Sequence, residues 1–177
     1  TNKGNVKTTS TSTTYTSSQY GIGGIVGCSY RTSADTVSTI NGCTNEGTVT
    51  SSAYCTGGIV GMNYYYGYVR NSVNKGKVKG TYYTGGVCGI NYPTSNTTVA
   101  NAPHIAYCNN TAVVSGTYYT GGITGSNGWS SSNYYAYTTY CNNSGNVTGT
   151  YYVGGVVGNN QSASTSYPAY VTYCSNS

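Results

Sequence analysis

The most informative feature of this sequence is what it lacks. Its 177 residues include no Phe and no Leu, one Met, one Trp, and two carboxylates, Asp35 and Glu46. Strong helix formers are scarce, which excludes a mostly helical protein. No apolar run approaches the roughly 18 residues of a transmembrane helix, so we expect no membrane insertion. Seven cations are too sparse for a nucleic-acid-binding surface, so we expect no nucleic-acid partner.

Five residue types make up most of the chain. There are 29 Thr, 26 Gly, 23 Tyr, 22 Ser and 20 Asn. Thr and Tyr favour strands, whereas Gly and Asn favour turns. Charged residues are only 5% and the net charge is +5, so the sequence lacks the high charge typical of disordered chains. This composition is typical of secreted proteins, and we expect an extracellular or cell-surface location.

A repeat of about 33 residues organises the chain. The pentad Gly-Gly-[Ile/Val]-x-Gly begins at Gly23, Gly57, Gly85, Gly121 and Gly154. An Asn-x-Gly-x-Val run, with Ala112 in the Gly position of the fourth copy, precedes each pentad. An apolar residue or Thr, three positions before a Cys or Ser, closes each unit. The single domain 1–177 therefore divides into units 1–43, 44–73, 74–108, 109–141 and 142–174.

Each unit contains three short β-like runs and is too small to bury a core alone, so the units must stack. Alignment of the units gives three β-branched columns: Val6, Val49, Val78, Val114 and Val147; Ile25, Ile59, Val87, Ile123 and Val156; and Ile40, Val69, Ile105, Thr138 and Val171. We predict an all-β fold, a parallel β-solenoid of about five rungs with three short strands per rung. A β-propeller or a β-sandwich is the alternative, but a propeller blade needs about 40 residues and four strands.

The motifs carry a family resemblance. C-x-N-x-G-x-V, G-x-Y-Y-x-G-G-[IV]-x-G and I-x-x-C together resemble the GLUG-type repeats of bacterial surface and secreted proteins. Such repeats also occur beside the catalytic part of some IgA-cleaving metalloproteases. The match covers almost the whole chain, which departs from the pattern by its surplus of Tyr and its near absence of Asp. The resemblance implies a right-handed β-helix-like region of an extracellular bacterial protein, and it brings no catalytic residues.

Candidate catalytic and metal-binding residues are few. Asp35 and Glu46 lie in different kinds of segment and do not form the carboxylate pair of a glycosidase. The single His, His104, occupies the position that holds Tyr68, Tyr137 or Tyr170 in other units, which predicts a ring within an aromatic column. Structural zinc needs four ligands, and His104 with Cys108 supplies two. We therefore predict no catalytic site, no metal, no cofactor and no enzymatic activity.

The cysteines cannot all pair within the chain, because there are seven. Four of them share one position of the repeat: Cys43, Cys108, Cys141 and Cys174. Ser72 fills the same position in the second unit, which favours a column of small buried free thiols. Adjacent rungs also lie within disulfide distance, so a bridge within the column stays an alternative.

Tyrosine gives the strongest indication of function. A Tyr stands three residues before every Gly-Gly pair: Tyr20, Tyr54, Tyr82, Tyr118 and Tyr151. Stacked rings contribute apolar area while their hydroxyls stay available to water or a partner. The rings form either a structural ladder that thickens the core or an exposed aromatic strip that contacts a glycan, a host protein or a neighbouring fibre.

The sequence favours a non-enzymatic structural protein, a β-solenoid segment of an extracellular fibre or cell-surface stalk. One alternative is an adhesin that binds glycan or host protein through a tyrosine-rich face. Another is an accessory repeat region of a secreted protease. The chain begins at the start of a unit and ends in the first positions of the next. We expect a segment of a longer array or a chain that assembles with its own copies, head to tail or laterally.

Overall fold

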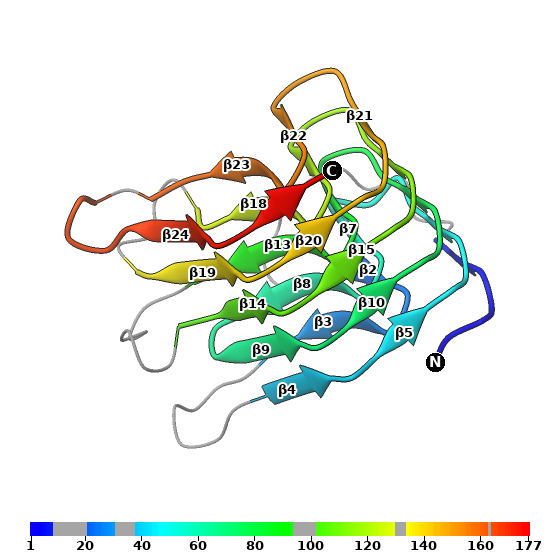
Figure 1. The fold of residues 1–177 in the computed structure, drawn as a ribbon, viewed down its shortest axis with the longest axis horizontal. Coiled ribbons are helices and arrows are strands. Elements are labelled where there is room, and N and C mark those ends of the chain that lie inside the picture. Colours follow the sequence, from blue (N-terminus) through cyan, green and yellow to red (C-terminus); the bar gives the residue numbers. More distant parts are fainter. Residues whose placement is uncertain (9–20, 31–37, 94–101, 130–133, 163) are drawn as a thin grey trace.

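The computed structural model describes residues 1–8, 21–30, 38–93, 102–129, 134–162 and 164–177. These residues form 25 short strands and no helix. Accordingly, the described part of the chain contains no helix of the length and apolar character that crossing a membrane requires. The strands stack into five parallel sheets, so the chain is a β-solenoid of about five turns (Figure 1). The prediction of an all-β parallel solenoid is confirmed.

Each sheet collects one equivalent strand from every turn. The Asn sheet holds β5 (Thr44–Asn45), β10 (Val73–Asn74), β15 (Asn109–Asn110), β20 (Asn142–Asn143) and β25 (Ser175–Asn176). The Val sheet holds β1 (Val6–Lys7), β6 (Val49–Thr50), β11 (Val78–Lys79), β16 (Val114–Ser115) and β21 (Val147–Thr148). The Gly sheet holds β2 (Gly21–Gly23), β7 (Cys55–Gly57), β12 (Tyr83–Gly85), β17 (Thr120–Gly121) and β22 (Val153–Gly154).

Two further sheets complete the turn. The fourth sheet holds β3 (Val26–Ser29), β8 (Val60–Tyr64), β13 (Cys88–Tyr92), β18 (Thr124–Asn127) and β23 (Val157–Asn160). The fifth sheet holds β4 (Ser38–Asn41), β9 (Gly67–Arg70), β14 (His104–Ala106), β19 (Ala136–Thr139) and β24 (Ala169–Thr172). In Figure 1 the fifth sheet and the Asn sheet run across the front of the molecule.

A turn carries five strands, so the prediction of three per turn is wrong. Two of the predicted runs are divided by bends that glycine permits. In the second turn the Asn-x-Gly-x-Val run bends at Gly47 and separates into β5 and β6. The pentad run bends at Gly58 and separates into β7 and β8.

The predicted apolar columns stack in register. Val49 pairs with Val6 on one side and Val78 on the other, and the column continues to Val147. The column from Ile40 to Val171 is likewise in register within the fifth sheet. In the third column the backbone N–H of Ile59 donates to the carbonyl of Val87 at 3.0 Å. These three predictions are confirmed.

The core is narrow: each turn contributes only a few buried side chains to it. Its main cluster joins the column of Ile59 and Val87 to the facing column of Val69 and Ile105, with Cys108 beside them. All of these side chains are buried. Full burial of one Val or Ile side chain contributes roughly 1.5–3 kcal/mol, and this contribution recurs in every turn.

The Gly-Gly pair of the pentad makes room for an asparagine. A Cβ on Gly86 would overlap the carbonyl oxygen of Gly122 and the side-chain amide of Asn110. The same holds one turn away, where a Cβ on Gly58 would meet Asn74. The second glycine of the pentad is therefore needed because the Asn side chain of the following Asn-x-Gly-x-Val run lies against it.

The Asn of that run forms a continuous ladder of amides through the molecule. Each Nδ2 donates to the Oδ1 of the next turn, from Asn2 to Asn45, Asn74, Asn110, Asn143 and Asn176, at 2.7–2.8 Å. Each interior Nδ2 also donates to the carbonyl two residues on, as from Asn45 to Gly47 at 2.9 Å. Four of the six amides are fully buried. We call this the first Asn ladder.

A second Asn ladder runs along the fourth sheet. Nδ2 of Asn63 donates to Asn91, Asn91 to Asn127, and Asn127 to Asn160, at 2.8–2.9 Å. These amides also bond across to the backbone near the fifth sheet, as from Asn127 to the carbonyl of Tyr170 at 2.9 Å. Buried amides need such partners, so both ladders specify the register of the turns.

Candidate functional site

The tyrosines predicted to form a strip do stack along the solenoid axis. Ring centroids lie 5.1 Å apart for Tyr54 and Tyr82, 5.0 Å for Tyr82 and Tyr118, and 4.9 Å for Tyr118 and Tyr151. Tyr151 is exposed and the three others are half-buried. The fifth predicted member, Tyr20, lies outside the described residues.

A second column of rings lies beside this strip, where Tyr54 and Tyr83 meet edge to face at 5.0 Å. Tyr83 stacks on Tyr119 at 4.8 Å, and Tyr119 stacks on Tyr152 at 4.9 Å. Tyr83 is only 6% exposed and packs with Met62 and Ile90, and burial raises the pKa of its phenol. The inner part of this aromatic surface is thus engaged in the core.

A different aromatic column crosses the outer face of the fifth sheet. His104 stacks between Tyr68, at 5.3 Å, and Tyr137, at 4.3 Å, and Tyr137 stacks on Tyr170 at 5.1 Å. The prediction that His104 is a ring in an aromatic column is confirmed. Burial lowers the pKa of His104, which keeps its imidazole neutral at pH 7.

A fourth column stands at the corner where the fifth sheet meets the Asn sheet. Tyr107, Tyr140 and Tyr173 stack at 4.9 and 4.8 Å, with their rings within 9° of parallel. Their backbone φ angles are 53°, 52° and 55°, in the left-handed region that bulky residues rarely adopt. The same corner carries Gly42 and Asn71 in the first two turns, also at positive φ.

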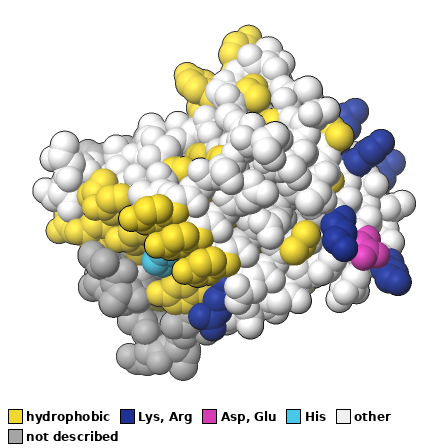
Figure 2. All heavy atoms as spheres, viewed as in Figure 1, with side chains coloured by type: hydrophobic (Ala, Val, Ile, Leu, Met, Phe, Trp, Pro, Cys, Tyr) yellow, Lys and Arg dark blue, Asp and Glu magenta, His cyan; other side chains and the backbone are white. Residues whose placement is uncertain are grey.

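Between these last two columns lies the aromatic groove. Its floor is a column of outward-facing residues held in register by the strands: Arg70, Ala106, Thr139 and Thr172. A hollow of about 280 Å³ is lined by floor residues together with Tyr68, His104, Tyr107 and Tyr140. In Figure 2 this face shows as a patch of hydrophobic side chains with the histidine among them.

Among the described residues, the lining of the aromatic groove carries little charge. Arg70 is the single charged side chain among the residues that line the hollow. Among the coloured side chains, Figure 2 shows most Lys and Arg, together with one acidic side chain, on the opposite side of the visible face. Chemically, the groove offers ring edges, phenol hydroxyls, threonine hydroxyls and one cation.

The four cysteines of the shared position are thiols in the structure. Cys108 and Cys141 are buried, and each Sγ donates to the carbonyl two residues earlier, at 3.2 Å in both cases. Ser72 in the same position donates to the carbonyl of Arg70 at 2.8 Å. The hydrogen bond with Cys108 raises the pKa of the Cys141 thiol to about 12. A Ser replaces Cys here because both supply a small donor at the same point.

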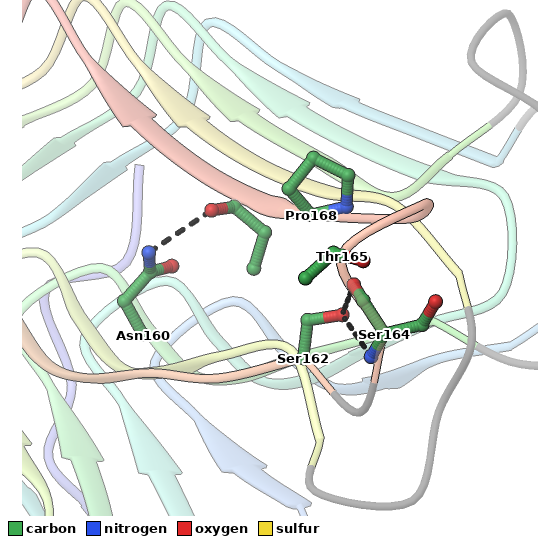
Figure 3. Close-up of a pocket in the computed structure, with 6 residues that line it drawn as sticks. Asn160, Ser162, Ser164, Thr165 and Pro168 are labelled. Atoms are coloured by element: carbon green, nitrogen blue, oxygen red, sulfur yellow. Dashed lines mark hydrogen bonds between the residues drawn. The ribbon is translucent and has the colours of Figure 1, made fainter.

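Other hollows lie at the end of the last turn. One of about 310 Å³ lies between β23 and β24 and is lined by Asn160, Ser162, Ser164 and neighbouring residues. Figure 3 shows that these polar groups serve one another: Asn160 Nδ2 donates to the carbonyl of Ala169 at 3.0 Å, and Ser162 Oγ donates to that of Ser164 at 3.0 Å. The described residues that line this hollow include no titratable side chain.

Within the described residues no three His, Cys, Asp or Glu side chains come together in a group that could hold a metal ion. Comparison of the chain with protein-family models, with curated proteins and with solved structures finds no match. The candidate site therefore has to be judged on its own geometry.

Two features were missed by the sequence interpretation. The aromatic groove escaped it, although the repeated Tyr107, Tyr140 and Tyr173 before the Cys position were a visible signal. The Asn ladders also escaped it, because Asn was interpreted as a turn former rather than as a buried hydrogen-bonding side chain. The recurrence of Asn at the first position of every Asn-x-Gly-x-Val run was the signal available.

Proposed function

We propose that this chain is a non-enzymatic structural protein, a β-solenoid segment of an extracellular fibre or cell-surface stalk. The observation that carries the proposal is the first Asn ladder, which runs without interruption through every turn. Such a ladder fixes each turn upon the next and suits a rod-like spacer. The resemblance to GLUG-type repeats supports an extracellular bacterial setting.

The proposal includes assembly of copies, head to tail or side by side. Parallel sheets leave strand edges at the first and last turns of residues 1–177, and such edges recruit another chain or further turns. The charged fraction of 5% offers little repulsion to close approach. A head-to-tail contact does not close on itself, so its product is a filament.

One detail of the two ends sharpens the test. Asn176 occupies the place above Asn143 that Asn2 of an added copy would need if its Val6 stacked upon Val147. In an assembly made from residues 1–177, a new copy in this register has to displace residues 175–177. We expect a variant that lacks residues 175–177 to assemble more readily than the full chain.

Electron microscopy and sedimentation of both proteins over a range of concentrations test the proposal. Filaments with an axial repeat of about 24 Å are expected, from five turns of about 4.8 Å each. Single particles from both proteins at the highest concentrations would overturn the assembly part of the proposal.

A second candidate function is an adhesin that binds a glycan or host protein through its tyrosine-rich face. The observation in its favour is the stack formed by Tyr54, Tyr82, Tyr118 and Tyr151, whose last ring is exposed. Exposed aromatic patches mark interaction surfaces. A glycan array with the wild-type chain and a Tyr118→Ser variant separates this function from a purely structural one.

A further inference from the structure

The corner tyrosines of the aromatic groove are held in an unfavourable backbone conformation. L-residues with a Cβ are disfavoured at positive φ, and tyrosine is bulky. Gly42 and Asn71 fill the same corner in other turns, so the fold does not require tyrosine there. Strain that persists where an easier residue would fit points to a role for the side chain.

Core packing does not supply that role. Tyr107, Tyr140 and Tyr173 are 57%, 48% and 76% exposed, whereas Tyr83 on the other aromatic face is almost fully buried. Their rings contact one another along the column at 4.8–4.9 Å. Much of each ring therefore faces solvent beside the floor of the groove.

The groove is straight and periodic. Its walls are the His104 column and the corner column, and its floor is the sheet column from Arg70 to Thr172. Because rings face their neighbours along each column, they present edges and hydroxyls to the groove. The corner tyrosines recur in the last three turns, with a spacing of about 4.8 Å along the axis.

We propose that the aromatic groove binds one extended β-linked polysaccharide chain, lying parallel to the solenoid axis with about one sugar per turn. The tyrosine hydroxyls of the walls and the hydroxyls of Thr139 and Thr172 can hydrogen-bond to sugar hydroxyls, and the ring edges give apolar contact to the C–H groups of the sugar. The advance per sugar in such an extended polymer is comparable with the spacing of the turns. The described lining, in which Arg70 is the one charged side chain, fits a neutral or weakly acidic polymer, with Arg70 available for an occasional acidic group.

A bound peptide fits this groove less well. β9, β14 and β19 are paired on both sides within the fifth sheet, so a peptide lying on them cannot be added as a strand. It would have to rely on side-chain contacts alone, without the main-chain hydrogen bonds that give extended peptides their affinity. A second copy of this chain is the other possible occupant, and the experiment below distinguishes it.

Affinity electrophoresis in gels that contain soluble derivatives of cellulose, chitin or xylan tests the proposal. The wild-type chain should be retarded by at least one of them. Tyr140→Asn should lose at least tenfold in affinity while its unfolding midpoint stays equal or rises, because Asn accepts positive φ. The matched control is Tyr152→Asn, since Tyr152 is also exposed and also has a positive φ, 51°, but lies on the other aromatic face.

Ala106→Arg provides a second variant that fills the floor and leaves the walls intact. Arg70 already occupies the equivalent position one turn earlier, so the substitution suits the strand. It should also weaken polysaccharide binding at least tenfold. Absence of wild-type retardation by all three polymers, or equal loss in Tyr140→Asn and Tyr152→Asn, would overturn the proposal.

Sedimentation at the same concentrations separates the groove from self-assembly. A dimer that Tyr140→Asn abolishes, without polysaccharide binding, would show that a second copy occupies the groove and would refute the glycan assignment. The inference gives the adhesin candidate a defined site on another face, and it stands whether or not copies form filaments.

Discussion

Removal of one amide from the middle of the first Asn ladder should destabilise the whole solenoid. Asn110 is fully buried. Its Nδ2 donates to the carbonyl of Ala112 at 2.8 Å and to Oδ1 of Asn143 at 2.7 Å. Its Oδ1 accepts from Asn74 at 2.7 Å and, at the longer distance of 3.4 Å, from the backbone N–H of Ala112. Asn110→Ala deletes all of these bonds, three of them short, and leaves buried partners behind.

The magnitude follows from those bonds. Three hydrogen bonds at about 1 kcal/mol each, with at least about 1 kcal/mol for a buried carbonyl left without its donor, predict a loss of about 4 kcal/mol. With a urea dependence of about 2 kcal/mol per molar, the unfolding midpoint should fall by about 2 M. Such a loss is a large part of the stability of an ordinary domain.

Urea unfolding followed by circular dichroism measures the effect, and Asn109→Ala is the matched control. Asn109 is the neighbouring residue of β15 but is exposed, so its substitution should change stability by less than about 0.5 kcal/mol. A double-mutant cycle with Asn74→Ala should show a coupling energy of about 0.5–3 kcal/mol, as expected for residues in one network. Equal effects of Asn110→Ala and Asn109→Ala would refute the claim that the ladder stabilises the fold.

Three further predictions concern other parts of the molecule. Gly122→Ala should cost at least about 1–3 kcal/mol in urea unfolding, because its Cβ would overlap the carbonyl of Gly155, whereas Gly4→Ala, with its nearest contact at 3.7 Å, should be nearly neutral. Stability should fall as the pH rises from about 9 to 12. In the folded state the hydrogen bond with Cys108 raises the pKa of Cys141 from 9.0 to about 12, and burial raises the pKa of Tyr64 from 10.0 to about 12. The unfolded chain therefore releases these protons first. A midpoint that is constant over this range, measured by urea unfolding at each pH, would contradict that reasoning. Alkylation without reductant at pH 8, followed by mass spectrometry, should leave Cys108 and Cys141 unlabelled in the folded protein. After unfolding, all seven cysteines should be labelled. Cysteines that stay unlabelled in the unfolded chain would indicate disulfides.

The repeat made much of the fold predictable from the sequence. The pentads, the Val column and the position three before Cys recur at every turn, and parallel stacking is the arrangement that places all equivalent residues in one environment. His104 could be assigned to an aromatic column because tyrosines fill the equivalent position in other units. These inferences need only the spacing of the repeated residues, which can be read for buried and exposed positions alike.

The number of strands and the roles of the asparagines depended on the tertiary structure. A glycine within a β-like run is compatible with a straight strand or a bend, and the local sequence does not decide between them. Asn favours turns locally, so its burial in a ladder depends on an acceptor supplied by the next turn.

The aromatic groove also depended on the tertiary structure. The sequence by itself determined the repeat, the stacking register and the presence of tyrosine columns, because these follow from which residues recur and at what spacing. It could not determine that the corner before each Cys position takes a positive φ, which turns Tyr107, Tyr140 and Tyr173 outward beside the fifth sheet. That geometry arises from the path of the chain between two sheets, and residues far apart in the sequence set it together.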